Sequence, residues 1–278
     1  MHLIVQAPEI GAAELASIAE RAGAQGIHPL EGGGQQAYRL SRVQTRAGVA
    51  EFCAAAGIDC AFVPPDLTRD RVRVVALDMD STLITIECID EIADMIGIKP
   101  QVAAITASAM RGEIDFRESL TRRVSLLAGM SATALERVYA ERLQLTPGAE
   151  RLLAGFAATG AKTLLVSGGF TFFTDRLQAR LAIDETAANA LEIADGKLTG
   201  RLVGNIVDAQ VKAARLRAMR ARYGHGGLVV AIGDGANDLP MLRQADISIA
   251  YRAKPVVRAE ATYAINRCGI DAVLNLFA

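Results

Sequence analysis

Two aspartates, Asp78 and Asp80, come directly after the apolar run Val72–Leu77. Carboxylates this close repel each other unless a cation or a shared proton lies nearby. A carboxylate can bind a hard cation such as Mg²⁺, accept a phosphoryl group covalently, or transfer a proton. Taken alone, such a pair is more often a solvated turn than a site, so its meaning depends on the residues that join it.

Two further polar segments also follow apolar runs. Ser167, Gly168 and Gly169 follow Leu164–Val166, where a hydroxyl and free backbone N–H groups could hold an anion. The segment Gly233–Asp238 follows Leu228–Ile232 and adds two carboxylates and an amide, which are Asp234, Asp238 and Asn237. Each segment alone could be an ordinary glycine-rich turn.

Lys212 lies in a helical segment from about Ala209 to Tyr223, between the second and third polar segments. A lone lysine is usually a solvated surface residue. The combination is more informative, because ligands of open α/β sheets bind at the carboxyl ends of the strands. Carboxylate oxygens suit Mg²⁺, whereas a hydroxyl, an ammonium and backbone amides suit phosphoryl oxygens. The residues therefore predict a site for phosphoryl transfer.

The apolar runs that precede these residues are typical of strands buried on both faces of a parallel sheet. They recur along the chain with helical segments between them, at Val72–Leu77, Lys162–Val166, Leu228–Ile232 and Ile247–Ala250. This alternation predicts a doubly wound α/β domain. Within Leu191–Leu202, the pair Asp195-Gly196 predicts a β-hairpin.

The interval from about residue 88 to residue 145 interrupts the alternation. It contains four helical patterns and no convincing strand: Ile89–Met95, Pro100–Met110, Phe116–Ala128 and Ala132–Arg142. We interpret it as a helical insertion after the first strand of the sheet.

The first seventy residues have a different pattern, β-α-β-β-α-β, which predicts a ferredoxin-like sheet with two helices on one face. The segments are Leu3–Gln6, Ala12–Ala22, Gly26–Leu30, Ala37–Val43, Ala47–Ala56 and Ile58–Val63, with a glycine-rich turn at 31–35. Pro64 and Pro65 then break the chain, and 66–70 is predicted to be a linker. We expect a small α+β domain at 1–68 and a larger domain at 69–278.

Composition excludes several classes of protein. The chain has 278 residues, 51% of them hydrophobic, and a formal net charge of −1, so neither a disordered chain nor a partner such as nucleic acid or an anionic membrane is expected. There is no Trp to stack on bases. The longest uncharged stretches are 12 residues, too short for a membrane span, and no signal peptide is evident. Four scattered cysteines fit a reducing compartment, so we expect a cytoplasmic protein.

The polar segments carry a family resemblance. The Asp-x-Asp-x-Thr box at 78–82, Ser167, Lys212 and the Gly-Asp-Gly-x-Asn-Asp run at 233–238 resemble the four motifs of the haloacid dehalogenase superfamily. The resemblance covers about 72–278 and implies a Rossmann-like core with a helical cap at about 88–145. The dehalogenases lack the second carboxylate, here Asp80. In this feature the chain resembles the phosphatases and mutases of the superfamily.

Within the superfamily, the chain is most similar to the phosphoserine phosphatases, through 78–83 followed by Glu87 and through the cap segment Phe116–Val124. The resemblance implies that Glu87 binds the ammonium and Arg123 the carboxylate of O-phospho-L-serine, while Met110 and Phe116 line the pocket. A zwitterionic amino acid does need both charges, and arginine can bind a carboxylate through two hydrogen bonds. Without the motifs, a cap salt bridge or two unrelated surface charges would be the simpler interpretation.

The resemblance also implies a reaction, the last step of L-serine biosynthesis. Asp78 attacks phosphorus and forms an aspartyl-phosphate, and Asp80 acts as general acid and then as general base. Lys212 restrains Asp78. Mg²⁺ is held by Asp78, by Asp234 and by the main-chain oxygen of Asp80, with Asp238 as a direct or supporting ligand. The phosphoryl oxygens are held by Ser167, Gly168, Asn237 and Lys212.

Other interpretations stay open at this point. Another small phosphoester could be the substrate, although a neutral sugar phosphate would not need Glu87 and Arg123. A phosphorylated switch resembling a receiver domain also uses acidic residues and a lysine. The N-terminal domain resembles ACT domains, which bind amino acids or mediate dimers, so a homodimer through this domain is possible.

Overall fold

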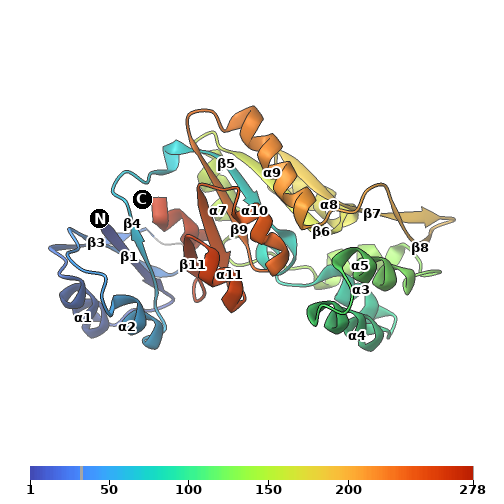
Figure 1. Cartoon of the computed structure of the whole chain (residues 1–278), viewed down its shortest axis with the longest axis horizontal. Helices are drawn as coiled ribbons and strands as arrows, with labels where there is room; N and C mark the ends of the chain where they lie inside the picture. The colour runs from blue at the N-terminus through green and yellow to red at the C-terminus, as the bar shows by residue number, and fades with distance from the viewer. Residues whose placement is uncertain (32–33, 278) are drawn as a thin grey trace.

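The computed structural model describes residues 1–31 and 34–277, and its N-terminal part forms a four-stranded antiparallel sheet in the order β2-β3-β1-β4 (Figure 1). The strands are β1 (His2–Ala7), β2 (Gly26–Leu30), β3 (Gln36–Ser41) and β4 (Asp59–Val63), and the helices are α1 (Ala12–Ala22) and α2 (Val49–Ala55). The predicted β-α-β-β-α-β order is confirmed. The glycine-rich turn predicted at 31–35 includes residues 32 and 33, which lie outside the described residues.

Strand β1 is buried on both faces, and its alternating side chains contact different partners. Leu3 and Val5 share an apolar cluster with both helices. Ile4 faces the opposite way and joins the cluster that contains the C-terminal Phe277. The sheet therefore has helices on one face and the rest of the molecule on the other.

The second sheet has seven strands in the order β11-β10-β9-β5-β6-β7-β8, and all neighbours are parallel except β7 and β8. The strands are β5 (Val72–Leu77), β6 (Lys162–Phe170), β7 (Glu185–Ala194), β8 (Lys197–Val203), β9 (Leu228–Gly233), β10 (Ile247–Tyr251) and β11 (Tyr263–Ile265). The predicted α/β class is confirmed. Strand β11 was not predicted, because three residues are too few to establish a pattern.

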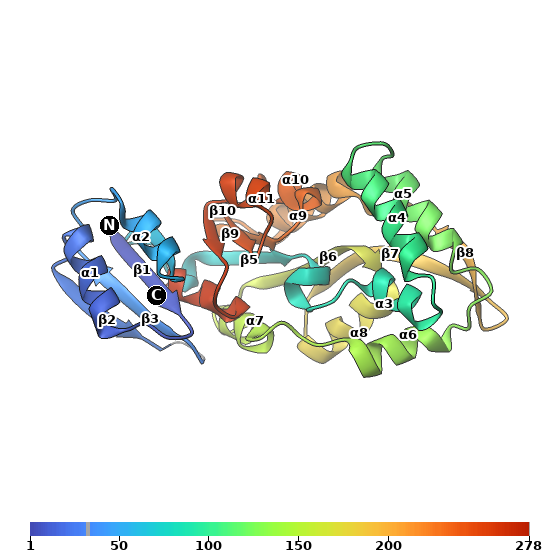
Figure 2. The ribbon, with the colours of Figure 1, turned by 90° about the horizontal axis from the view of Figure 1, so that it is seen from below.

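Helices cover both faces of this sheet, as Figure 2 shows. Val75 and Leu77 of β5 pack with one helical layer, and Val74 and Ala76 pack with the other. The first layer contains α7 (Ala149–Ala157), α8 (Thr171–Leu181) and the C-terminal 3₁₀ segment Ile270–Phe277; the second contains α9 (Ala209–Tyr223), α10 (Leu239–Leu242) and α11 (Pro255–Glu260). In residues 1–31 and 34–277, no helix has the length and apolar character needed to cross a membrane.

A helical insertion separates β5 from β6 and lies at the opposite end of the core from the N-terminal sheet (Figures 1 and 2). We call it the cap; its elements are α3 (Cys88–Met95), α4 (Lys99–Met110), α5 (Phe116–Ser125), α6 (Thr133–Arg137) and the turn Val138–Arg142. The insertion was predicted. Helix α5 begins where Asp115 accepts a hydrogen bond from the Glu118 N–H, and it ends three residues earlier than predicted.

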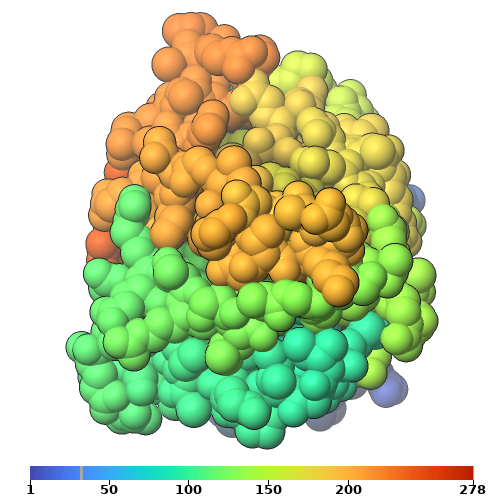
Figure 3. Space-filling model, turned by 90° about the vertical axis from the view of Figure 1, so that its right-hand side faces the viewer, coloured from blue at the N-terminus to red at the C-terminus, as the bar shows by residue number. Residues whose placement is uncertain are grey.

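The hairpin β7–β8 reaches past the core and contacts the cap. Its turn residues, Asp195 and Gly196, both have positive φ (51° and 72°), as a type I′ turn requires, so the predicted hairpin is confirmed. The Leu198 N–H donates to Met130 O, and the Gly129 N–H donates to Leu198 O, each at 2.8 Å. Figure 3 shows the hairpin lying against the cap at this end of the molecule.

Candidate active site

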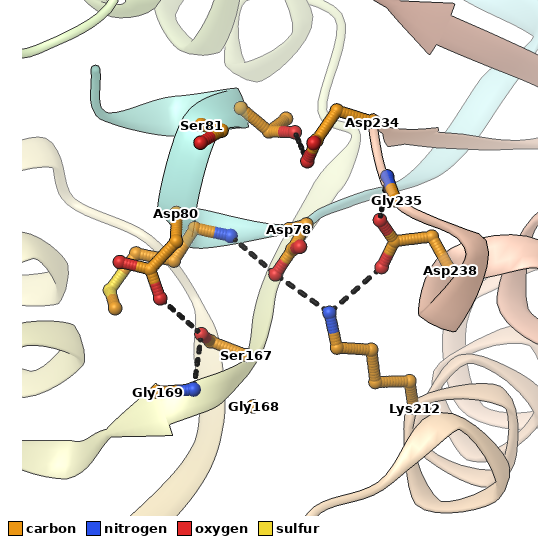
Figure 4. Close-up of polar contacts among 12 residues, drawn as sticks. Asp78, Asp80, Ser81, Ser167, Gly168, Gly169, Lys212, Asp234, Gly235 and Asp238 are labelled. Carbon is orange, nitrogen blue, oxygen red and sulfur yellow. Dashed lines mark hydrogen bonds and ion pairs between the residues drawn. The ribbon is translucent and has the colours of Figure 1, made fainter. Parts of the chain in front are cut away.

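The ends of β5, β6 and β9 are adjacent in the sheet, so the predicted site residues meet at one edge (Figure 4). Lys212, from α9, lies between two of the aspartates. Its Nζ is 2.7 Å from Asp78 Oδ1 and 2.8 Å from Asp238 Oδ1. Asp78 Oδ1 also accepts a hydrogen bond from the Met79 N–H at 2.7 Å. The orientation of the Asp78 carboxylate is therefore fixed by two donors.

These groups are almost completely removed from water, and Lys212 is 1% exposed. Burial and the neighbouring Asp238 raise the pKa of Asp78 well above its ordinary value, against the opposing effect of Lys212. Although burial disfavours its charge, the Asp238 and Asp78 carboxylates raise the pKa of Lys212. One ammonium is thus paired with two carboxylates, which leaves an excess of negative charge at the site.

Asp234 completes a group of three carboxylates. Single oxygens of Asp78, Asp234 and Asp238 lie within 4.8 Å of one another. Burial, and then the charge of Asp238, raises the pKa of Asp234 to about 6, and the Thr82 hydroxyl donates to Asp234 at 3.1 Å. An oxygen-only set with uncompensated charge fits a hard divalent cation. The metal site expected from the sequence is consistent with this cluster.

The Asp80 carboxylate is bonded to a different set of groups. Its Oδ1 accepts a hydrogen bond from the Cys88 N–H at 3.0 Å, and its Oδ2 accepts one from the Ser167 hydroxyl at 3.4 Å. Burial raises the pKa of Asp80, which favours the protonated form of the acid. A Cβ atom at Gly169 would lie 2.7 Å from Asp80 Oδ2, so the absence of a side chain there lets the carboxylate fit.

A cavity of about 420 Å³ lies between the strand ends and the cap. This volume is typical of a small-molecule site. The cavity is lined by predicted residues from the core and the cap: Asp78, Asp80, Ser167, Gly168, Asp234, Asn237, Glu87, Met110, Phe116 and Arg123. Lys212 and Asp238 are not in this lining, but each contacts a residue that is. Lys212 contacts Asp78, and Asp238 accepts a hydrogen bond from the Gly235 N–H.

The two predicted cap charges lie in the cavity without contacting each other. Glu87 accepts a hydrogen bond from the Ser81 hydroxyl at 2.7 Å, and burial, then the Asp80 charge, raises its pKa to about 7. Arg123 donates a long hydrogen bond, 3.4 Å, to Ser119 O, and burial lowers its pKa. Among the described residues, Arg123 has no carboxylate within 4.0 Å. The alternative of a cap salt bridge is therefore wrong.

Some residues of the lining were not predicted, among them Asp90, Thr106, Ser119 and Lys254. Lys254 follows β10, whose strand was predicted, and its N–H donates to Asp234 O at 3.2 Å. The position of this lysine after a predicted strand is a sequence signal that points to the cavity. Asp90, Thr106 and Ser119 carry no sequence signal. They lie on cap helices, and only the packing of the cap against the core brings them to the cavity.

Comparisons with known proteins agree with this geometry. Residues 75–243 match the family of haloacid dehalogenase-like hydrolases, which is more than half of the chain. The chain therefore belongs to this family.

The relatives narrow the assignment further. A phosphoserine phosphatase from Polaromonas sp. (strain JS666) is 52% identical over 226 residues, which are 79% of this chain and 96% of that protein. The unliganded structure of a probable phosphoserine phosphatase from Vibrio cholerae has a TM-score of 0.86 and 35% identity, over 99% of this chain and 86% of that one. The resemblance to the phosphoserine phosphatases within the family is thus confirmed.

Another solved structure is informative because it is shorter. A substrate-bound phosphoserine phosphatase complex matches with a TM-score of 0.68 and 33% identity, over 74% of this chain and 99% of the other. That protein therefore has no counterpart for about a quarter of this chain. The N-terminal sheet and its helices, within residues 1–63, make up a fraction of similar size.

Proposed function

We propose that this chain hydrolyses O-phospho-L-serine to L-serine and phosphate with Mg²⁺ as its metal. One observation carries the proposal: a fixed carboxylate, Asp78, and two unpaired cap charges, Glu87 and Arg123, line the same cavity. The first group suits attack on phosphorus, and the other two suit the two charges of an α-amino acid.

In the proposed first step, the Asp78 carboxylate attacks phosphorus and the bond from phosphorus to the serine oxygen breaks. Asp80 gives its proton to the leaving oxygen, and its raised pKa supports that protonated form. In the second step, water attacks the aspartyl-phosphate, Asp80 takes a proton from the water, and the bond from phosphorus to Asp78 breaks. Both carboxyl groups then return to their starting states.

The surrounding residues position and neutralise the phosphoryl group. Lys212 holds Asp78, and we propose that Ser167, Gly168, Asn237 and Lys212 hold the phosphoryl oxygens. A divalent cation, held by Asp78, Asp234 and the Asp80 main-chain oxygen, would offset charge on those oxygens. Asp238, fully buried between Lys212 and the Gly235 N–H, would support this cation directly or from behind.

We propose that the cap selects the substrate. Glu87 would bind the substrate ammonium and Arg123 its carboxylate. Met110 and Phe116 line the same cavity. The Phe116 ring also contacts the core, since a Cβ atom on Gly168 would lie 2.9 Å from Phe116 Cζ. The cap can therefore cover the phosphoryl site while it binds the amino-acid part.

The proposal is tested by measuring phosphate release from O-phospho-L-serine, first with Mg²⁺ and then with excess EDTA. Rapid release that EDTA abolishes, and that far exceeds release from sugar phosphates, is the expected result. Release from other phosphoesters alone would keep the aspartate chemistry and reject the roles of Glu87 and Arg123. A long-lived phosphoprotein without turnover would support the switch interpretation.

We also propose the domain limits 1–68 and 69–278, with the cap at about 88–145, because separate sheets form on either side of residue 68. A homodimer through the N-terminal domain stays a prediction. Sedimentation of the full chain over a range of concentrations would test it, and a monomer throughout would reject it.

A further inference from the structure

A buried amide outside the predicted motifs contacts the phosphoryl end of the cavity. Asn189, on β7, is 1% exposed. Its Nδ2 donates to Gly168 O at 2.8 Å and to Gly169 O at 3.2 Å, and its Oδ1 accepts from the Val207 N–H at 2.8 Å. All its hydrogen-bonding groups are used on backbone atoms of two other segments.

Asn189 lies where β6 and β7 cease to pair regularly. The register between these strands shifts between Val166 and Phe170, and beyond the shift Phe170 pairs with Asn189. Ser167, Gly168 and Gly169 therefore leave the regular ladder of hydrogen bonds. Within this interruption, the side-chain amide of Asn189 donates hydrogen bonds to the carbonyls of Gly168 and Gly169.

The Gly168–Gly169 peptide is connected to Asp80 by hydrogen bonds through Ser167. The C=O of Gly168 and the N–H of Gly169 belong to one planar trans peptide, so they point in opposite directions. With the C=O held by Asn189, the Gly169 N–H donates to Ser167 Oγ at 2.8 Å. The Ser167 hydroxyl in turn donates to Asp80 at 3.4 Å, as Figure 4 shows.

The other end of the amide holds the segment that precedes α9. Asn189 accepts a hydrogen bond from the Val207 N–H. The next residue, Asp208, caps α9 by accepting hydrogen bonds from the N–H groups of Gln210 and Val211. Helix α9 carries Lys212, which contacts Asp78. Asn189 thus joins the loop that bears Ser167 to the start of the helix that bears Lys212.

We propose that Asn189 is a positioning residue for the phosphoryl site, which it serves by fixing the Gly168–Gly169 peptide and thereby the Ser167 hydroxyl. The proposal rests on the proposed function, because it assigns Asn189 to the phosphoryl half of that site. It makes a selective claim: binding of phosphate depends on Asn189, whereas binding of L-serine through the cap does not.

Asn189→Asp is the sharpest variant, because it keeps the size and the acceptor toward Val207 but replaces the donors that hold the two carbonyls. Asn275→Asp is the matched control. Asn275 is also buried, at 4% exposure, and its amide donates to Gln6 at 2.8 Å, but it does not line the cavity. Asn189→Ser provides a second variant if Asn189→Asp fails to fold.

The measurements are kcat and KM for O-phospho-L-serine, and the affinities for inorganic phosphate and for L-serine by calorimetry, on the full chain with Mg²⁺. Asn189→Asp is expected to lower kcat about 100-fold and to weaken phosphate binding about tenfold, with L-serine binding unchanged. Asn275→Asp should leave all of these values within about twofold of the parent chain.

Two outcomes would overturn the proposal: an unchanged kcat and phosphate affinity in Asn189→Asp, or an equal weakening of phosphate and L-serine, which would indicate a general structural role. If the unmodified chain did not hydrolyse O-phospho-L-serine, the proposed function would fail on its own. Phosphate affinity would still show whether Asn189 supports an anion site.

Discussion

The cap and the N-terminal domain are attached to opposite ends of the same core. Both share buried apolar side chains with it, but their polar contacts with the core differ in kind. The N-terminal contact includes a buried carboxylate whose oxygens are hydrogen-bonded. The Asp59 carboxylate, 5% exposed, accepts hydrogen bonds from the consecutive N–H groups of Asn266, Arg267 and Cys268 at 2.8–3.3 Å. Ile4 adds an apolar contact with the core.

The main polar contact of the cap with α9 is largely exposed. Arg117 donates to Asp208 at 2.8 Å, and its side chain is 53% exposed. An ion pair this exposed contributes about 0–1 kcal/mol. The cap charges Glu87 and Arg123 face the cavity and are not paired with each other.

This difference indicates what each unit does. Buried contacts with satisfied hydrogen bonds have a high free energy of local opening, and solvated contacts have a low one. We therefore expect the N-terminal domain to stay fixed while the cap opens for the substrate and closes for the reaction. Changes in the cap should alter substrate binding, and changes at the N-terminal contact should alter stability alone.

The largest effect is expected in the core that both units share. Asp78→Asn removes the proposed nucleophile but keeps its size, and kcat should fall by about 10⁴-fold or more. Phosphate release from O-phospho-L-serine measures this. Circular dichroism of the variant is the control for folding. Full activity in the Asp78→Asn variant would remove Asp78 as the nucleophile.

The cap is tested by Arg123→Met. Loss of the partner for the substrate carboxylate should raise KM for O-phospho-L-serine about 100-fold, with little effect on a phosphoester that lacks a carboxylate. Arg122→Met is the matched control, since Arg122 is exposed on the same helix, pairs with Glu118 and does not line the cavity. Equal losses on both substrates would contradict the role of Arg123.

The N-terminal contact is tested by Asp59→Ala. The variant leaves three backbone N–H groups without their acceptor, and the free energy of unfolding should fall by about 3 kcal/mol, measured in urea. At temperatures where the variant is folded, kcat and KM should equal those of the parent chain. Asp66→Asn, at a side chain 74% exposed, should change neither quantity. An altered KM in Asp59→Ala would show that the two ends of the core are coupled.

The smallest effect is a pH dependence of substrate binding. The pKa of Glu87 is about 7, so the group is neutral below that pH and anionic above it. KM for O-phospho-L-serine should therefore fall as pH rises through about 7, by at most tenfold per pH unit. The substrate also titrates, and the pH profile of the Glu87→Gln variant measures that contribution, because the variant lacks the Glu87 carboxyl group. A parallel pH profile in that variant would exclude Glu87 as the titrating group.

Much of the core followed from the sequence. Buried parallel strands have a distinct apolar pattern, so Asp78, Ser167 and Asp234 could be placed at strand ends, and strand ends meet at one edge of a parallel sheet. The Asp195-Gly196 turn was equally predictable, because its backbone angles depend on two adjacent residues. The order of elements in the N-terminal domain followed from period and turn signals alone.

Other features depend on residues far apart in the chain. Asp59 contacts backbone groups more than 200 residues away, and no local pattern marks it as an interface residue. Asp90 and Thr106 reach the cavity only through the packing of the cap helices against the core. The amide of Asn189 acquires its role from a break in the ladder between β6 and β7.

The sequence by itself therefore determined the element types, the family and the polar groups that follow the strands, because each depends on short-range backbone preferences or on a few residues at fixed spacing. Tertiary structure alone decided which buried polar groups are satisfied, which charges stay unpaired and which attached unit is held firmly. These properties depend on the partner that a side chain meets, and that partner is set by the packing of distant segments.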